Sequence, residues 1–374
     1  MDIFNDQRVV LTLDAGGTNF VFSAIKAGSE IANPIVLPSN ANNIDTCLNT
    51  IITGFQEISN LILPEKPVAI SFAFPGPADY KQGIIGDLIN LPAFRGGVAL
   101  GPMLEEIFGL PTFINNDGDL FAYGEAIGGM LPKLNADLRK NHIPKQYHNL
   151  FGITLGTGFG GGIIHNNQIL DGDNSAGGEI WLMRDFKHTQ LLVEESVSIR
   201  AVQRVYAEES GDSTLRSPQH IYHIAIGKED GNKMAALMAF EELALMVGEA
   251  LANAVTLIDA PVVIGGGISG AADLILPTVV KHLNGTIENL KGEKIPRLVS
   301  KVYNMDDTAS YSEFLNWKTQ TIQVPFSERR VSYSAEKKLV VGLSHLGTSK
   351  AICLGAYAFA LANIDQKIRE KVNL

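Results

Sequence analysis

The chain has 374 residues, a length typical of two domains, and 45% of them are hydrophobic, which is enough for two buried cores. The formal net charge of −10 argues against a nucleic-acid-binding surface, and Cys47 and Cys353 give neither a disulfide framework nor metal-site spacing. No long apolar run and no secretory signal pattern occur, so we expect a cytoplasmic protein that does not enter a membrane.

The first predicted elements are two buried strands on either side of a tight turn, within residues 9–25. Asp14 stands where the first strand ends, and Gly16, Gly17 and Thr18 follow it. Glycines allow the backbone to approach a ligand closely, and successive N–H groups in such a turn can bind an anion. Asp14 suits a metal ion that accompanies phosphate. An ordinary hairpin turn fits the same residues, so this stretch alone leaves both interpretations open.

Apolar periodicity and turn residues place further helices and strands along the chain. We expect helices over residues 43–63, 103–108, 120–127, 198–209, 233–258, 271–283 and 351–372, and strands over residues 68–74, 112–116, 150–155, 163–165 and 261–264. Residues 131–148 are polar and basic, and residues 285–347 are charged and irregular, so we interpret both segments as insertions.

A strand, a glycine turn and a returning strand occur a second time at residues 150–165. This turn contains Gly156, Thr157 and Gly158, which align with the turn of the first hairpin. A duplicated hairpin of this kind is more specific for phosphate than either copy alone. A third glycine cluster suits a nucleotide at a helix N-terminus, although a plain strand–helix turn also fits. It consists of Gly265, Gly266 and Gly267.

Six sequence blocks in this order resemble the ROK family (repressors, open reading frames, sugar kinases) of the actin-like ATPase superfamily. They are two phosphate motifs at 13–18 and 155–162, an adenosine motif at 263–269, turns at 75–77 and 90–92, and an Asn-Asp pair at 116–117 followed by Gly-Glu at 124–125. Regulators of this family carry an N-terminal helix-turn-helix, whereas the first strand here begins near residue 8. The resemblance therefore favours the kinase branch.

The resemblance implies an α/β fold of two actin-like ATPase (ribonuclease H-like) domains with a central interdomain cleft, each with a mixed five-stranded sheet. The small domain would comprise residues 1–118 and 356–374. The large domain would comprise residues 119–355, with the insertions near 131–148 and 285–347. ATP would lie on the large domain with its phosphates between the two hairpins, and a sugar would lie deeper. A homodimer follows by family analogy only.

The resemblance also assigns roles to single residues. Asp117 is the general base that takes the proton of the sugar hydroxyl. The sugar-binding residues are Gly76, Asn90, Asn116, Glu179 and Glu194. ATP is bound by Asp14, Gly16, Gly17, Thr18, Gly156, Thr157, Gly158, Gly265, Gly266 and Gly267, and Asp14 holds Mg²⁺ through phosphate or water. Local sequence alone favours Asp117 as the cap of the following helix, and Asp119 is the better candidate for a pure cap.

The sugar motif of the family, Glu-x-Gly-His, is only half present. Glu179 matches its first residue, but Trp181 replaces the glycine and Leu182 replaces the histidine. The cysteine cluster of the family is absent, so we expect no structural zinc. His188 and Trp181 are candidates to replace the histidine, although a solvated loop histidine and a packed aromatic ring fit as well.

We therefore expect an ATP- and Mg²⁺-dependent kinase that phosphorylates the 6-hydroxyl of a hexose or an N-acylated hexosamine. One alternative is a catalytically altered sugar-binding or sensor protein, which the changed Glu-x-Gly-His motif favours and the intact Asp117 and hairpins oppose. Another alternative is a kinase of a modified sugar or of a substrate that is not a sugar.

Overall fold

The computed structural model describes residues 2–15, 18–76, 78–86 and 93–372. By its internal contacts the chain divides into two compact units. Unit 1 comprises residues 1–129, 162–178 and 346–374, and unit 2 comprises residues 130–161 and 179–345. The domain boundaries expected from the sequence, near residues 118 and 356, stay a prediction.

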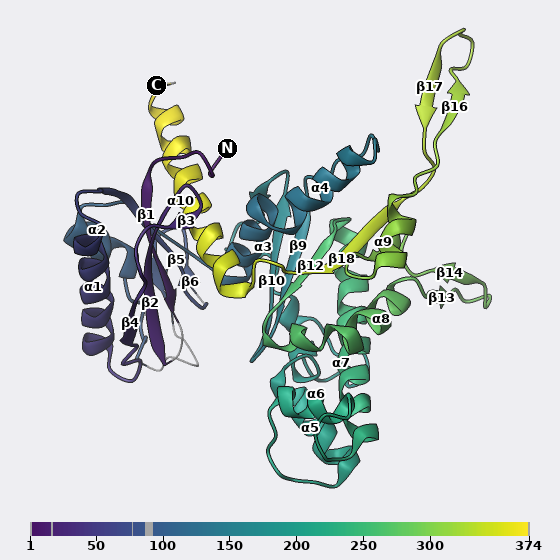
Figure 1. Ribbon diagram of the computed structural model, residues 1–374, viewed down its shortest axis with the longest axis horizontal. Helices are drawn as coiled ribbons and strands as arrows, with labels where there is room; N and C mark the ends of the chain where they lie inside the picture. The colour runs from purple at the N-terminus through teal and green to yellow at the C-terminus, as the bar shows by residue number, and fades with distance from the viewer. Residues whose placement is uncertain (1, 16–17, 77, 87–92, 373–374) are drawn as a thin grey trace. The chain divides into compact units, whose positions relative to one another are not determined.

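The sheet of unit 1 begins with the predicted hairpin (Figure 1). Its strand order is β3-β2-β1-β5-β8, and β4 also pairs with β2. Strands β1 and β2 are antiparallel, whereas β1, β5 and β8 run parallel. The six strands in the described part are one more than expected, because two short segments both pair with β2. The bounds are β1 (Val9–Ala15), β2 (Asn19–Lys26), β3 (Ser29–Glu30), β4 (Ile35–Pro38), β5 (Pro67–Ala73) and β8 (Thr112–Asn115).

Helices cover both faces of this sheet because side chains alternate along β1. Leu11 and Leu13 belong to a core cluster with residues of α1 (Ile44–Leu61) and α2 (Leu100–Phe108). Helix α10 (Thr348–Val372) packs against β1, β5 and β8. These contacts place the final helix of the chain against its first strand.

Helices α3 (Asp117–Gly128) and α10 pack with their backbones in contact. A Cβ atom on Gly355 would overlap the carbonyl oxygen of Leu120, and one on Gly124 would overlap the carbonyl oxygen of Ala351. Only glycine allows helices to approach this closely. Since Asp117 is the first residue of α3, this contact fixes where its helix begins.

The second sheet has the order β11-β10-β9-β12-β18-β15, so it also consists of a hairpin followed by further strands. Strands β9, β12, β18 and β15 run parallel. Helix α7 is buried on most sides and packs against α8, α5 and α6. The bounds are β9 (Leu150–Leu155), β10 (Phe159–His165), β11 (Gln168–Ile169), β12 (Val262–Gly265), β15 (Lys301–Asn304), β18 (Lys338–Leu343), α5 (Ile199–Ser210), α6 (Pro218–Ala225), α7 (Lys233–Ile258) and α8 (Ala272–Leu283).

The two segments interpreted as insertions contain regular structure, which differs from the expectation. Residues 130–140 form α4 (Met130–Lys140), whose leucines 131, 134 and 138 are buried. Residues 285–347 contribute β15, α9 (Thr308–Leu315) and β18 to the second sheet and its cover. Strand β18 was not expected because it begins with Lys338, and a lysine is typical of an exposed segment. The side chain is in fact buried, and its ammonium group donates to the carbonyl of Asn316, just after α9, at 2.7 Å.

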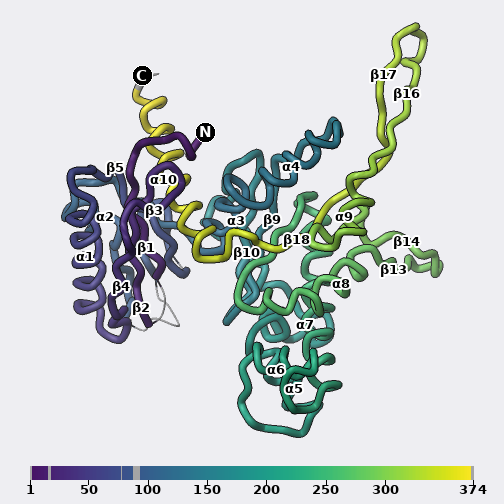
Figure 2. Tube along the Cα trace, viewed as in Figure 1, coloured from purple at the N-terminus to yellow at the C-terminus, as the bar shows by residue number. Residues whose placement is uncertain are grey.

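Two hairpins within this stretch extend from unit 2 (Figure 2). They are β13 (Thr286–Glu288) with β14 (Lys294–Pro296), and β16 (Gln320–Gln323) with β17 (Arg330–Tyr333). A further small hairpin in unit 1 pairs β6 (Ala78–Asp79) with β7 (Ile84–Ile85). Within residues 285–347, the expectation of irregular structure thus applies only to the connections between the strands and helices of that segment.

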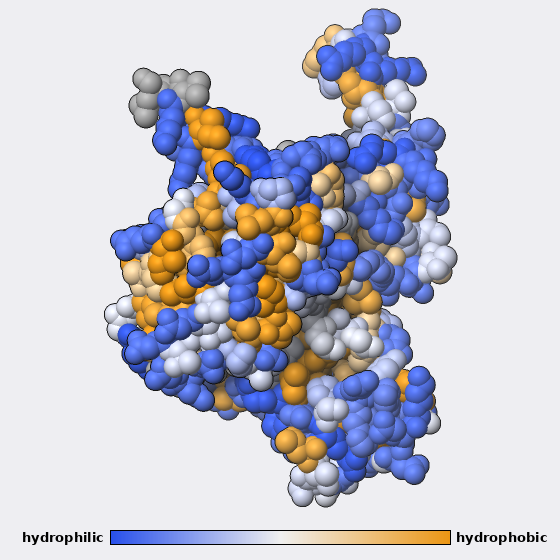
Figure 3. Space-filling model, turned by 60° about the vertical axis from the view of Figure 1, so that its left-hand side comes forward, coloured by the Kyte–Doolittle hydropathy of each residue, from blue (hydrophilic) through white to orange (hydrophobic). Residues whose placement is uncertain are grey.

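The face drawn in Figure 3 carries clusters of hydrophobic residues surrounded by hydrophilic ones. Across the described residues, no helix combines the length and the apolar character that crossing a membrane requires.

We predict that Gly355→Ala lowers the free energy of unfolding by about 1–3 kcal/mol, because the added methyl group must push α3 away from α10. This loss would appear although alanine is intrinsically the better helix former, by about 1 kcal/mol. Denaturant unfolding measures the change. Gly270→Ala is the control, because its Cβ would meet no atom within 4 Å. Equal stability of the two variants would contradict the proposed contact.

Candidate active site

Asp117 is the first residue of α3, directly after the end of β8. The helix cap is Asn116, whose Oδ1 accepts the N–H of Gly118 at 2.7 Å. Oδ1 of Asp117 accepts the same N–H at 2.9 Å. The interpretation of Asp117 or Asp119 as the helix cap is therefore wrong, and Asp119 is instead buried in the first turn of α3.

The surroundings of Asp117 change its acidity. Loss of surrounding water raises the pKa of Asp117, the N–H groups of Gly118 and of Asp117 itself oppose this shift, and the carboxylate of Asp14 adds to it. The side chain nevertheless remains accessible to solvent. A carboxylate that is poorly hydrated, accessible and raised in pKa has the properties of a general base.

Tyr80 joins two of the predicted sugar ligands in unit 1. Its hydroxyl donates to the carbonyl of Phe74 at 2.9 Å, and Nδ2 of Asn116 donates to it at 3.5 Å. A Cβ on Gly76 would lie 3.2 Å from the same hydroxyl oxygen. The structure thus brings Gly76 and Asn116 together around a residue that the sequence analysis missed.

The predicted sugar carboxylates of unit 2 lie in one loop. Glu179 precedes the short helix η1 (Ile180–Leu182), and its carboxylate accepts a hydrogen bond from Nε1 of Trp181. Glu194 lies in η2 (Val193–Glu195), and its Oε2 accepts the N–H of Phe159 at 2.9 Å. Glu194 therefore contacts the turn of the second glycine hairpin directly.

The predicted nucleotide-binding glycines differ in whether packing within the protein requires glycine at their positions. A Cβ on Gly158 would lie 2.6 Å from Oε2 of Glu194. Gly266 has a φ of +89°, and a Cβ there would overlap the backbone of Leu155. By contrast, a Cβ on Gly156 or Gly267 would meet no atom within 4 Å. The protein itself does not require glycine at these two positions, whereas a closely approaching ligand would.

A cavity of about 280 Å³ lies beside this third glycine cluster. It combines the aromatic side chains of Tyr222 and Phe240 with the backbone of Gly267, so it fits a flat ring. The lining comes from α6, α7 and η3 (Gly267–Ala271) and comprises Pro218, Gln219, Tyr222, His223, Phe240, Gly267, Ile268, Gly270 and Ala271. Gly265, the first glycine of the cluster, ends β12.

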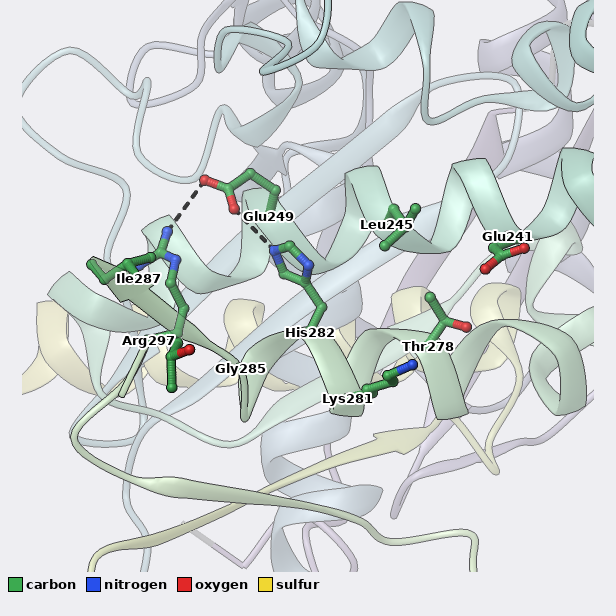
Figure 4. Close-up of a pocket in the computed structure, with 10 residues that line it drawn as sticks. Glu241, Leu245, Glu249, Thr278, Lys281, His282, Gly285, Ile287 and Arg297 are labelled. Carbon is green, nitrogen blue, oxygen red and sulfur yellow. Dashed lines mark hydrogen bonds and ion pairs between the residues drawn. The ribbon is translucent and has the colours of Figure 1, made fainter. Parts of the chain in front are cut away.

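A different cavity, of about 320 Å³, is lined by none of the predicted site residues (Figure 4). Three of the lining groups pair with one another, because Glu249 contacts His282 at 2.9 Å and Arg297 at 3.3 Å. These side chains come from α7, α8 and the segment after β14. Their mutual pairing leaves no clear indication of a ligand.

Of the residues predicted to bind phosphate, metal or sugar, Gly16, Gly17 and Asn90 lie outside the described residues. Asp14 lies near the end of β1, and the carbonyl of Thr18 accepts the N–H of Ser39 at 2.9 Å. Within the described ranges, no three His, Cys, Asp or Glu side chains gather as a metal site. A single carboxylate fits Mg²⁺ that keeps waters and phosphate as its other ligands, so this site stays a prediction.

The second glycine turn is held by its neighbours. The carbonyl of Thr157 accepts a hydrogen bond from Arg200 at 3.3 Å, and the carbonyl of Gly156 accepts the N–H of Ile199 at 2.9 Å. Further along β10, a Cβ on Gly162 would overlap the carbonyl oxygen of Gly118. The strand that follows the turn therefore lies against the first turn of α3, next to Asp117.

Two α/β units, each with a hairpin at a glycine turn that continues into parallel strands, define an actin-like ATPase fold. A profile of the ROK family matches residues 10–307, and the chain belongs to this family.

The most similar proteins found include sugar kinases. The crystal structure of a glucokinase from Parabacteroides distasonis is 54% identical, with a TM-score of 0.88, over 97% of this chain and 99% of that chain. A glucokinase of Halalkalibacterium halodurans is 26% identical over 300 residues, 74% of this chain and 85% of that protein. An N-acetyl-D-glucosamine kinase of Photobacterium profundum is 26% identical over 326 residues, 82% of this chain and 98% of that protein.

We predict that Gly156→Val leaves the fold intact but weakens ATP binding, because only a bound phosphate would meet the new side chain. Gly266→Val should instead lower stability, since it strains a positive φ and overlaps Leu155. Thermal unfolding and calorimetric ATP titration separate the two effects. Unchanged ATP affinity in a folded Gly156→Val variant would remove this turn from the nucleotide site.

The pH dependence should follow Asp117. Its protonated form cannot accept a proton, so kcat/KM should fall as the pH is lowered through the raised pKa, above the ordinary value of 3.8. Asp14→Asn removes a charge that raises this pKa, so the acidic limb should move to lower pH even if activity is reduced. Asp45→Asn, in the first turn of α1, serves as the control. A limb that stays in place in Asp14→Asn would argue against this assignment.

Proposed function

We propose that this chain is an ATP-dependent sugar kinase that transfers the γ-phosphate to the 6-hydroxyl of a hexose or an N-acylated hexosamine. The observation that carries the proposal is Asp117, an accessible carboxylate of raised pKa beside Asn116. The 54% identical glucokinase and the related N-acetyl-D-glucosamine kinase support a sugar as the acceptor.

Transfer needs a deprotonated acceptor and a neutralised phosphate. Asp117 takes the proton of the sugar hydroxyl as the bond to phosphorus forms. Mg²⁺, when bound, neutralises phosphate charge, and Asp14 would hold it through phosphate or water, with Thr18 as a ligand of the nucleotide. The adenine ring enters the cavity beside Tyr222 and Phe240, and the phosphates approach the open positions of Gly156 and Gly267.

The proposed sugar ligands fall in two groups. Gly76 and Asn116 lie around Tyr80 in unit 1. Asn90, which lies outside the described residues, is the further ligand that the family resemblance predicts. Glu179 and Glu194 accept hydrogen bonds from sugar hydroxyls. Leu182, which stands in place of the family histidine, is exposed, so Trp181 takes over part of that role by holding Glu179. His188, the other candidate to replace the family histidine, donates its backbone N–H to Asp185, and its side chain is exposed.

A second candidate is a sugar-binding protein that does not transfer phosphate. The altered Glu-x-Gly-His motif favours it, because Trp181 and Leu182 stand where the family has glycine and histidine. We also propose that the protein is cytoplasmic and that it forms a homodimer. Light scattering of the purified protein tests the homodimer. The absence of structural zinc stays a prediction that elemental analysis of the purified protein can check.

The test is a coupled ADP-release assay with Mg²⁺ over a panel of hexoses, N-acylated hexosamines, modified sugars and polyols. We expect turnover with one or more hexoses and none with 6-deoxy analogues, which lack the acceptor hydroxyl. Asp117→Asn should abolish turnover but keep ATP binding, because it removes the base and preserves the shape. Sugar binding without turnover in the wild type would instead support the sugar-binding protein.

A further inference from the structure

The segment of residues 179–196 in unit 2 folds as one hydrogen-bonded loop that carries both expected sugar carboxylates. The carbonyl of Met183 accepts the N–H of Val193 at 2.7 Å, and the N–H of Asp185 donates to the carbonyl of Leu191 at 3.0 Å. Two arms therefore run side by side, one continuing from η1 and the other leading into η2. A displacement of either arm would move one carboxylate relative to the other.

Asp185 lies at the turn between these arms and is fully buried. A buried carboxylate is costly unless its oxygens accept hydrogen bonds. Oδ1 accepts the N–H groups of Lys187 and His188, each at 2.8 Å, and Oδ2 accepts the hydroxyl of Ser196 at 2.6 Å. Because Ser196 directly follows η2, this last bond ties the turn to the arm that carries Glu194.

The two glutamates depend on this arrangement. The carboxylate of Glu179 is held by Trp181 on the first arm, and that of Glu194 by the N–H of Phe159. Asp185 contacts neither of them, so its influence passes through the loop backbone. A misplacement of about 1 Å at such groups can cost about a hundred-fold in rate.

We propose that Asp185 is a positioning residue for the sugar: its buried hydrogen bond to Ser196 holds the loop so that Glu179 and Glu194 engage one sugar together. The proposal rests on the proposed function, since it takes these glutamates as sugar ligands. We call the hydrogen bond between the carboxylate of Asp185 and the hydroxyl of Ser196 the clamp, and both of its residues belong to this loop.

Asp185→Ala removes three hydrogen bonds and should raise the KM for the sugar about 10- to 100-fold. The KM for ATP and the kcat at saturating sugar should stay near wild type. Asp185→Asn should restore most of the sugar affinity, because its oxygen still accepts both N–H groups and its amide can donate to Ser196. Ser196→Ala should give an intermediate value, because only one bond is lost.

A second measurement follows the loop without any sugar. The chain has two tryptophans, so Trp317→Phe leaves Trp181 as the single fluorescent reporter within the loop. In that background, Asp185→Ala should increase iodide quenching of Trp181, and Asp185→Asn should reverse the increase. Asp307→Ala is the matched control, because it removes a carboxylate that accepts the N–H of Ser310 at the start of α9. It should change neither quenching nor sugar KM.

The outcomes separate the two proposals. Increased quenching together with a selective rise in sugar KM supports the clamp. Unchanged quenching in a folded Asp185→Ala variant overturns it, as does increased quenching with an unchanged sugar KM or with equal losses for sugar and ATP. If the wild type phosphorylates no compound in the panel, the proposed function fails, while Trp181 quenching still decides whether Asp185 holds the loop.

Discussion

Backbone contact between α3 and α10 at Gly124 and Gly355 determines where Asp117 stands. A helix that must touch its neighbour's carbonyl oxygens has little freedom to slide or rotate, so its first residue is fixed along with its middle. Gly162 adds a second contact at the start of α3, against Gly118. The position of Asp117 is thus set by contacts between main-chain atoms, and rotation of side chains does not alter these contacts.

The carboxylates of the candidate site share one feature. Asp117 accepts the N–H of Gly118, Glu179 accepts the indole N–H of Trp181, and Glu194 accepts the N–H of Phe159. Each is therefore oriented before any ligand arrives, so little ordering remains to be done on binding. A carboxylate has room for further donors, so such a contact directs the group without using up its capacity.

The sequence predicted elements best where one local pattern decided the outcome. Helix α7 matches its predicted bounds because apolar residues recur along its whole length, and the hairpins follow from their glycine turns. Strand β18 was missed because a lysine in the sequence is typical of an exposed segment. The carbonyl groups that accept hydrogen bonds from the buried Lys338 belong to residues 313–316, which precede it by more than twenty residues. The contacts of Tyr80 and the clamp at Asp185 were likewise missed, since both depend on pairing across loops rather than on periodicity.

The order of the strands has a consequence for how the chain reaches this fold. Strand β18 lies between β12 and β15 in the second sheet, and α10 covers the sheet of unit 1, yet both come from the last part of the chain. Neither core can close before residues 338–372 are synthesised, so folding depends on contacts of long sequence separation and is expected to be slow. During that interval one face of the first sheet is uncovered and the edge of β12 is unpaired, and exposed apolar surface and strand edges of this kind favour aggregation.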